Sequence, residues 1–110
     1  MLAIRRLHGR YRLLLLSNTN ELHFRHLEPQ LPVLACMERR LLSYELGLRK
    51  PARAIYERAI AAAGVDPERI VYIDDVAAYT RAAAELGIQA VTFESAAQLE
   101  RVLRERGVAL

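Results

Sequence analysis

Three short stretches of the chain carry polar side chains that can do chemistry, and they hold Ser17 and Asn18, Lys50, and the adjacent Asp74 and Asp75. A hydroxyl and backbone N–H groups bind phosphoryl oxygens, and an ammonium group offsets their negative charge. Two neighbouring carboxylates repel each other unless a cation or a proton lies between them, so a hard ion such as Mg²⁺ is their natural partner. These residue types therefore indicate a phosphate site that contains Mg²⁺.

Each stretch also has a purely structural interpretation. Asp75 can cap a helix that starts near Val76 while Asp74 is solvated, because Asp is a preferred N-cap residue. Ser17 can satisfy backbone groups in a turn, and Lys50 can be a solvated residue at the start of a helix. Lys50 is nevertheless the only lysine beside fifteen arginines, which favours a role for its compact point charge. From these residues alone both interpretations stay open.

The elements that must position these side chains alternate between strands and helices. Residues 70–75 read Ile-Val-Tyr-Ile-Asp-Asp and predict a buried strand that ends in the two acids, and residues 11–16 predict a second strand that ends at Ser-Asn. Further expected elements are helices at 1–8, after Asn20 and at 51–63 with Pro51 in its first position, and a strand at 41–44. The last ones are a helix at 76–86, a strand at 90–93, and a helix to about Arg106 that opens with a capping box at 95–98.

This alternation predicts right-handed βαβ crossovers and a parallel sheet, with the acids at the carboxyl edge where ligands bind in open α/β sheets. With 110 residues, the chain is expected to form a single domain over 1–110. No apolar stretch approaches the roughly 20 residues of a membrane span, and the N-terminus does not resemble a signal peptide. Cys36 is the only cysteine, which excludes an internal disulfide and favours a reducing cytoplasm.

Charge and histidine content favour neither nucleic acid nor zinc as a partner. The net charge is +3, but the sixteen basic residues are spread along the chain among thirteen acids, without an aromatic-interleaved basic stripe. A dedicated role in nucleic-acid binding is therefore not expected. His23 and His26 can face one way on a helix, yet no third ligand for zinc is evident near them.

The order and spacing of the three stretches resemble the haloacid dehalogenase (HAD) superfamily, in particular its phosphatase-like members. Leu-Leu-Leu-Leu-Ser-Asn-Thr-Asn at 13–20 looks like the second motif of that family, and Ser-Tyr-Glu-Leu-Gly-Leu-Arg-Lys-Pro at 43–51, followed by Ile-Tyr at 55–56, looks like the third. Residues 70–75, followed by 82–87, look like the acidic fourth motif. The likeness runs from about residue 5 to 108.

The resemblance implies a Rossmann-like three-layer α/β sandwich with a mainly parallel sheet. It also implies roles for the residues at the motif positions. Ser17 and Asn18 are expected to contact the phosphate, Lys50 to stabilise the phosphate and the nucleophile, and Asp74 and Asp75 to bind Mg²⁺.

The departures from the family pattern are as informative as the matches. The first family motif is Asp-x-Asp, in which one aspartate is the nucleophile, but the three aspartates of this chain are Asp66, Asp74 and Asp75 and none forms this motif. The first strand and the cap region are expected to be missing, so the fold is incomplete. Smaller departures are Met-Glu at 37–38, where relatives often carry Phe-Asp, and Tyr79, where an Asn often follows the acids.

Two functions of different classes follow from this pattern. The first is the C-terminal part of a Mg²⁺-dependent phosphohydrolase for a small phosphorylated metabolite, inactive alone because the nucleophile motif is absent. The second is a non-catalytic module derived from the family that binds phosphate, metal or another protein. A response-regulator receiver fits the acidic pair and the single lysine, but its order of motifs differs, because Lys50 precedes the acids.

The missing first strand also predicts association. In the family this strand lies between the strand that ends at Ser17 and the one that ends at Asp74, so without it two apolar strand edges keep unpaired backbone groups. The chain is therefore expected to self-associate or to bind a partner that supplies the strand.

Overall fold

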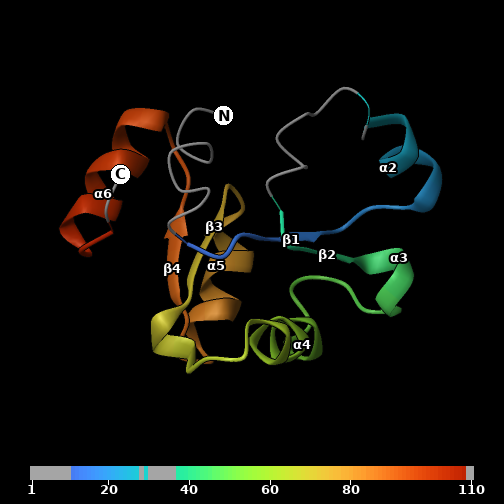
Figure 1. The fold of residues 1–110 in the computed structure, drawn as a ribbon, viewed down its shortest axis with the longest axis horizontal. Coiled ribbons are helices and arrows are strands. Elements are labelled where there is room, and N and C mark those ends of the chain that lie inside the picture. Colours follow the sequence, from blue (N-terminus) through green and yellow to red (C-terminus); the bar gives the residue numbers. More distant parts are fainter. Residues whose placement is uncertain (1–10, 28, 30–36, 109–110) are drawn as a thin grey trace. The chain divides into compact units, whose positions relative to one another are not determined.

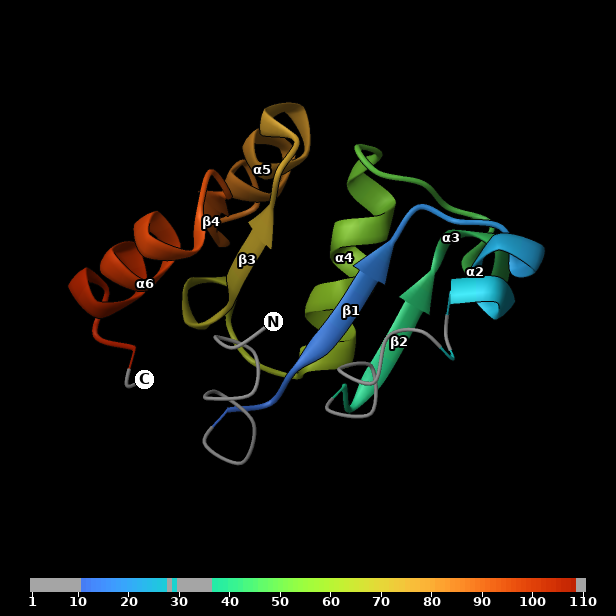
Figure 2. The same ribbon diagram turned by 90° about the horizontal axis from the view of Figure 1, so that it is seen from above.

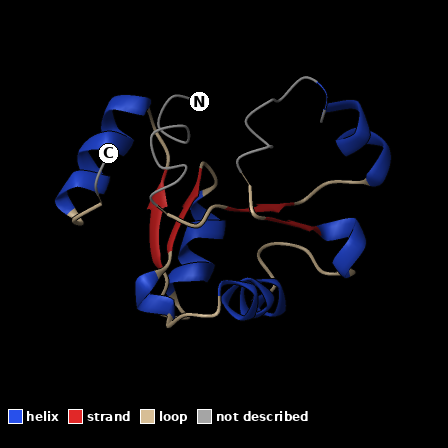
Figure 3. Cartoon of the chain, viewed as in Figure 1, coloured by secondary structure: helices blue, strands red, loops and turns tan. Residues whose placement is uncertain are grey.

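The computed structural model describes residues 11–27, 29 and 37–108, so the expected helix at 1–8 and Cys36 lie outside the described part. The chain divides into two compact units, Met1–Arg49 and Lys50–Leu110. Helices alternate with strands in each of them (Figure 1 and Figure 3). Both strand pairs are parallel, which confirms the predicted α/β class and its parallel pairing.

The described part of the first unit contains one pair of strands and two short helices. Its elements are β1 (Leu14–Ser17), α2 (Glu21–Leu27), β2 (Arg39–Leu42) and α3 (Ser43–Leu46). β1 and β2 run side by side, with Leu14 opposite Arg39 and Ser17 opposite Leu42 (Figure 2). Phe24 and Leu42 are buried together, and Leu15 packs against them. The apolar run before Ser17 therefore holds the Ser-Asn stretch at the carboxyl end of a strand.

The second unit contains the other pair of strands. Its elements are α4 (Arg53–Ala63), the 3₁₀ helix η3 (Pro67–Arg69), β3 (Val71–Asp74), α5 (Ala77–Ala84), β4 (Gln89–Thr92) and α6 (Ala96–Glu105). β3 and β4 pair with Val71 opposite Gln89 and Asp74 opposite Thr92. α5 packs against both strands and also contacts α4. The run Val-Tyr-Ile thus forms the predicted strand, which starts one residue later than expected and has Asp74 as its last residue.

Two helix boundaries follow the local signals in the sequence. α4 ends at Gly64, which adopts the left-handed conformation (φ 69°) and donates its N–H to Ile60 at 3.0 Å. At the start of α6, the Ser95 hydroxyl accepts the Gln98 N–H at 3.1 Å, and the Gln98 side chain accepts the Glu94 N–H at 3.2 Å. The capping box is confirmed, although its return bond goes to the residue before the cap.

Other boundaries differ from the prediction. The strand expected at 41–44 runs from Arg39 to Leu42, because Ser43 starts α3 and turns its hydroxyl to the backbone of Thr19. Pro51 was expected at the first helical position, but α4 begins at Arg53. Ala52 still has an extended backbone (φ −61°, ψ 132°), and Pro51 follows a cis peptide bond.

Among residues 11–27, 29 and 37–108, each sheet has two strands and every strand is four residues long. Parallel strands usually lie inside larger sheets, and two-stranded sheets are marginally stable in isolation. The strand content of the described part is therefore that of an incomplete sheet. Within this part, every helix is too short or too polar to cross a membrane.

Candidate active site

The acidic pair lies at the carboxyl end of β3, as the sequence predicted. Asp74 is the last residue of the strand, and its carboxylate forms an ion pair with Lys50 that joins Nζ to Oδ2 over 2.7 Å. Only 9% of the Lys50 side chain and 7% of the Asp74 side chain are exposed. The structure thus brings together two of the predicted site residues, in a nearly buried pair.

Both carboxylate oxygens of Asp74 accept hydrogen bonds from the protein. Besides the Lys50 ammonium, Oδ2 accepts the Tyr72 hydroxyl, and Oδ1 accepts the backbone N–H of Val76 at 3.0 Å. Burial alone would raise the pKa of the Asp74 carboxyl, but the hydrogen bonds from Lys50, Tyr72 and Val76 outweigh it and leave that pKa lowered. Asp74 is therefore a carboxylate at neutral pH.

Aromatic rings surround the ammonium group of Lys50. Nζ lies 4.9 Å from the ring centroid of Tyr79 and 5.9 Å from that of Tyr72, within the range of cation–π attraction. Tyr72 meets Tyr56 edge to face, with 5.8 Å between the ring centroids and 75° between the ring planes. Burial raises the pKa of Tyr72, with the hydrogen bond to Asp74 as the next cause. The Tyr72 hydroxyl thus stays a donor at neutral pH.

Asp75 has a different environment from its neighbour. Its side chain is exposed, and it makes no hydrogen bond or ion pair with the described residues. The N-cap of α5 is Val76, and the N–H of Val76 is bound by Asp74. The structural alternative for the acids is therefore wrong in both halves, because Asp74 is not solvated and Asp75 does not cap the helix.

Ser17 and Asn18 are both half-buried in the first unit, where Ser17 ends β1. Asn18 lines a small polar cavity of about 240 Å³, and the other lining residues are Thr19, Asn20, Ser43 and Arg49. Asn18 thus borders open space, as a ligand-binding residue must. Ser17 is not among the residues that line this cavity.

A hydroxyl that had no assigned role holds this turn. The buried Ser43 hydroxyl accepts the N–H of Thr19 and donates to the Thr19 carbonyl, both over 2.8 Å. Both backbone polar groups of Thr19 are therefore satisfied by one side chain at the start of α3. In the sequence, Ser43 follows an apolar run and is the first residue of the third motif, and neither signal predicts a contact with Thr19.

Tyr72 was also missed, although the sequence contains a signal for it. Residues two apart on a strand point to the same face, so Tyr72 shares a face with Asp74. A hydroxyl-bearing ring beside a carboxylate is a natural hydrogen-bond donor. Tyr79 departs from the family pattern, and its ring contacts the Lys50 ammonium, which an Asn at this position could not do through a ring.

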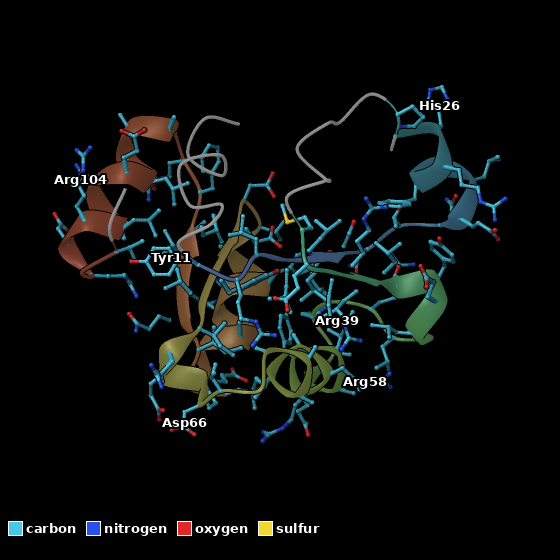
Figure 4. All side chains as sticks on the ribbon, in the orientation of Figure 1. Tyr11, His26, Arg39, Arg58, Asp66 and Arg104 are labelled. Atoms are coloured by element: carbon cyan, nitrogen blue, oxygen red, sulfur yellow. The ribbon has the colours of Figure 1, made fainter. Side chains whose placement is uncertain are left out.

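The described donor set fits a divalent cation only in part. No group of three or more His, Cys, Asp or Glu side chains suited to a metal occurs within the described ranges. Mg²⁺ commonly takes one or two carboxylates and completes its shell with water and phosphate oxygens, and the exposed Asp75 meets that requirement. His26 is exposed on α2, and Asp66 is exposed at the start of η3 (Figure 4). The side chain of His23 lies outside the described part.

Comparison with known proteins gives one consistent result. A model of the haloacid dehalogenase-like hydrolases matches residues 1–87. A HAD family enzyme of Bacteroides thetaiotaomicron, solved as the wild-type protein in complex with magnesium and inorganic phosphate, is 30% identical with a TM-score of 0.78. That similarity covers 88% of this chain and 54% of the other.

Two further solved structures are similar. A predicted HAD-like family hydrolase of Porphyromonas gingivalis is 30% identical with a TM-score of 0.81, over 93% of this chain and 55% of the other. An uncharacterized protein of Corynebacterium glutamicum is 25% identical with a TM-score of 0.77, over 99% of this chain and 80% of the other. The chain spans about half the length of the Bacteroides and Porphyromonas relatives.

Proposed function

The chain belongs to the haloacid dehalogenase-like hydrolases, and on that premise we propose that it is the C-terminal part of a Mg²⁺-dependent phosphohydrolase for a small phosphorylated metabolite. The observation that carries the proposal is the nearly buried ion pair of Lys50 and Asp74 at the carboxyl end of β3, next to the exposed Asp75. The magnesium and phosphate bound by the Bacteroides relative support the choice of ligands.

Each of the five site residues has a role in this proposal. Lys50 offsets the charge of the phosphate, while Ser17 and Asn18, at the carboxyl end of β1, bind phosphate oxygens through a hydroxyl and polar backbone groups. The carboxylates of Asp74 and Asp75 provide the negative charge for Mg²⁺. When bound, Mg²⁺ would offset the charge of the phosphate and help to orient it.

The nucleophile must come from outside this sequence. No Asp-x-Asp occurs among the 110 residues, and positioning and charge alone do not replace a carboxylate nucleophile. Each sheet has only two short strands within the described residues, which supports a missing strand. We therefore propose that an upstream segment or another polypeptide supplies this strand together with the nucleophile. The single Cys36 supports the cytoplasm as the compartment.

A second candidate is a non-catalytic module that binds phosphate, metal or protein. Two observations favour this candidate: both Asp74 oxygens accept hydrogen bonds from the protein, and the Lys50 ammonium also contacts the ring of Tyr79. A lysine with these contacts has a structural role in its own chain. The two candidates differ in what happens when the missing motif is restored. An incomplete enzyme gains turnover, whereas a binding module does not.

The test is hydrolysis of p-nitrophenyl phosphate by the purified chain, with and without Mg²⁺. The chain alone should show no turnover, and a segment with the family's Asp-x-Asp motif added in trans should restore it in a Mg²⁺-dependent way. Asp75→Asn is the matched control, because it should abolish the restored activity without disturbing a buried group. Mg²⁺-dependent turnover by the chain alone would show that a nucleophile is present in it. Lack of restoration in a folded complex would favour the binding module.

A further inference from the structure

We propose that Tyr72 is a positioning residue that holds Asp74 against Lys50, so that Asp75 is the carboxylate left open to a divalent cation. The proposal rests on the proposed function for its cation, whereas the role of Tyr72 stands on the geometry of the second unit alone. In this proposal Asp74 orients Lys50, and Asp75 binds the metal.

Both carboxylate oxygens of Asp74 already accept hydrogen bonds from the protein. Its Oδ2 receives both the Lys50 ammonium, at 2.7 Å, and the Tyr72 hydroxyl, while its Oδ1 receives the N–H of Val76 at 3.0 Å. A cation that binds Asp74 directly must displace one of these donors. Displacing Lys50 would leave a nearly buried ammonium group without its counterion, which is costly.

The surroundings of Tyr72 carry the second step. Its ring packs edge to face on Tyr56, which is fully buried, so the hydroxyl of Tyr72 is held in one direction. Tyr79 adds a ring at 4.9 Å from the Lys50 ammonium. Lys50 is therefore fixed by a carboxylate and two rings, and the Tyr72 hydroxyl is the one neutral side-chain donor that fixes the carboxylate within the described part.

The exposure of Asp75 carries the third step. It follows the strand end directly, is exposed, and makes no hydrogen bond or ion pair with the described residues. Its oxygens can bind a cation without breaking any contact of the described part. Cation binding at Asp74 would break a hydrogen bond or an ion pair, whereas cation binding at Asp75 would break none within the described part.

The single lysine makes the role of Tyr72 measurable. Reductive methylation with ¹³C-formaldehyde labels only Lys50 and the N-terminal amine. Lys50 should react slowly in the wild-type chain and give a ¹³C-methyl signal shifted by the neighbouring rings. Tyr72→Phe should raise the labelling rate by roughly tenfold, the factor for losing one hydrogen bond to a charged group, and move the signal toward that of an exposed lysine.

Thr92→Val is the control for the labelling experiment. It removes the 2.8 Å hydroxyl contact between Thr92 and Thr80 in the same unit and keeps the ring and the hydroxyl of Tyr72, so the rate and the signal of Lys50 should stay as in the wild type. A Tyr72→Phe chain whose Lys50 labels as slowly as the wild type would overturn the positioning role. So would an equal change in Thr92→Val, because that would trace the effect to general loosening.

Binding of Mn²⁺, followed by electron paramagnetic resonance, tests the division of the acids. Asp75→Asn should lower the Mn²⁺ affinity by at least roughly tenfold and leave the Lys50 signal unchanged. Tyr72→Phe should leave the Mn²⁺ affinity unchanged and move the Lys50 signal. Full Mn²⁺ affinity in Asp75→Asn would overturn the assignment to Asp75. A wild-type chain that takes up no Mn²⁺ would overturn the proposed Mg²⁺ site, and the Lys50 label would still decide the role of Tyr72.

Discussion

Lys50 and Asp74 form an ion pair in which Nζ lies 2.7 Å from Oδ2 and less than a tenth of each side chain is exposed. The partners are 24 residues apart, and α4 and η3 lie between them in the sequence. Removing two charges from water is costly, and further hydrogen bonds must offset that cost. Tyr72 and Val76 provide them, which sets this pair apart from the exposed i,i+4 ion pair of Arg53 and Glu57.

Asp74→Asn should lower the free energy of unfolding by about 3–5 kcal/mol, because it leaves the Lys50 ammonium nearly buried without a counterion. Urea unfolding at pH 7, followed by circular dichroism, measures the change. Asp75→Asn removes the same charge from an exposed position and should change the free energy by less than about 0.5 kcal/mol. Equal effects of the two variants would contradict the burial difference between the two acids.

Acid should remove the contribution of Asp74 to stability. Its pKa is lowered in the folded chain, so its contribution is complete above the unfolded pKa of about 3.9 and disappears as the pH falls through the lower folded value. The stability gap between the wild type and Asp74→Asn should therefore be constant from pH 7 to about pH 4 and narrow below it. Urea unfolding at a series of pH values measures this gap. A gap that already narrows between pH 7 and 5 would contradict the lowered pKa.

The sequence predicted the position of the acids but not their environments. An apolar run that ends in two carboxylates determines that both lie at the end of β3. Which of them is buried depends on the face that each side chain presents and on what packs there. The spacing of two residues on β3 places Tyr72 on the same face as Asp74, but the ammonium of Lys50 comes from 24 residues away and no local pattern predicts its contact with Asp74.

A tertiary contact also explains one of the boundaries that were wrong. The run at 41–44 has the apolar character of a strand, but Ser43 satisfies the backbone of Thr19 and α3 begins there. The capping box at 95–98 was predictable because both of its partners lie within a few residues of each other. The local capping signal was therefore correct, the local signal of Pro51 placed the start of α4 two residues too early, and the contact of Ser43 with a distant partner was not predictable.

Ser43→Ala should destabilise the chain by about 1–3 kcal/mol, because it leaves the N–H and the carbonyl of Thr19 without their partner in a partly buried place. Urea unfolding measures the loss. Thr19→Ala is the matched control, since its hydroxyl makes only a 3.3 Å exposed contact with the Asn20 carbonyl, and it should cost less than about 0.5 kcal/mol. A larger loss of stability in Thr19→Ala than in Ser43→Ala would show that the hydrogen bonds of Ser43 to the Thr19 backbone do not hold the turn.

Ser95→Ala should cost about 1 kcal/mol, because the Ser95 hydroxyl caps the N–H of Gln98 at the start of α6. Thermal unfolding followed at the helical circular dichroism signal measures the loss. Ser95→Asn keeps a capping oxygen and should restore most of the stability. Equal losses in both variants would indicate that the hydroxyl matters through packing and not through the cap.

The chain should self-associate or take up a strand from a partner, because β1 pairs only with β2 and β3 only with β4 within the described part. Apolar strands with unpaired backbone groups bind further strands, and two-stranded sheets are marginally stable alone. Size-exclusion chromatography with light scattering should show a mass that rises with concentration, and a segment with the family's first strand should suppress this rise. A monodisperse monomer that unfolds cooperatively would contradict the prediction, because it would show that the two sheets are stable without another strand.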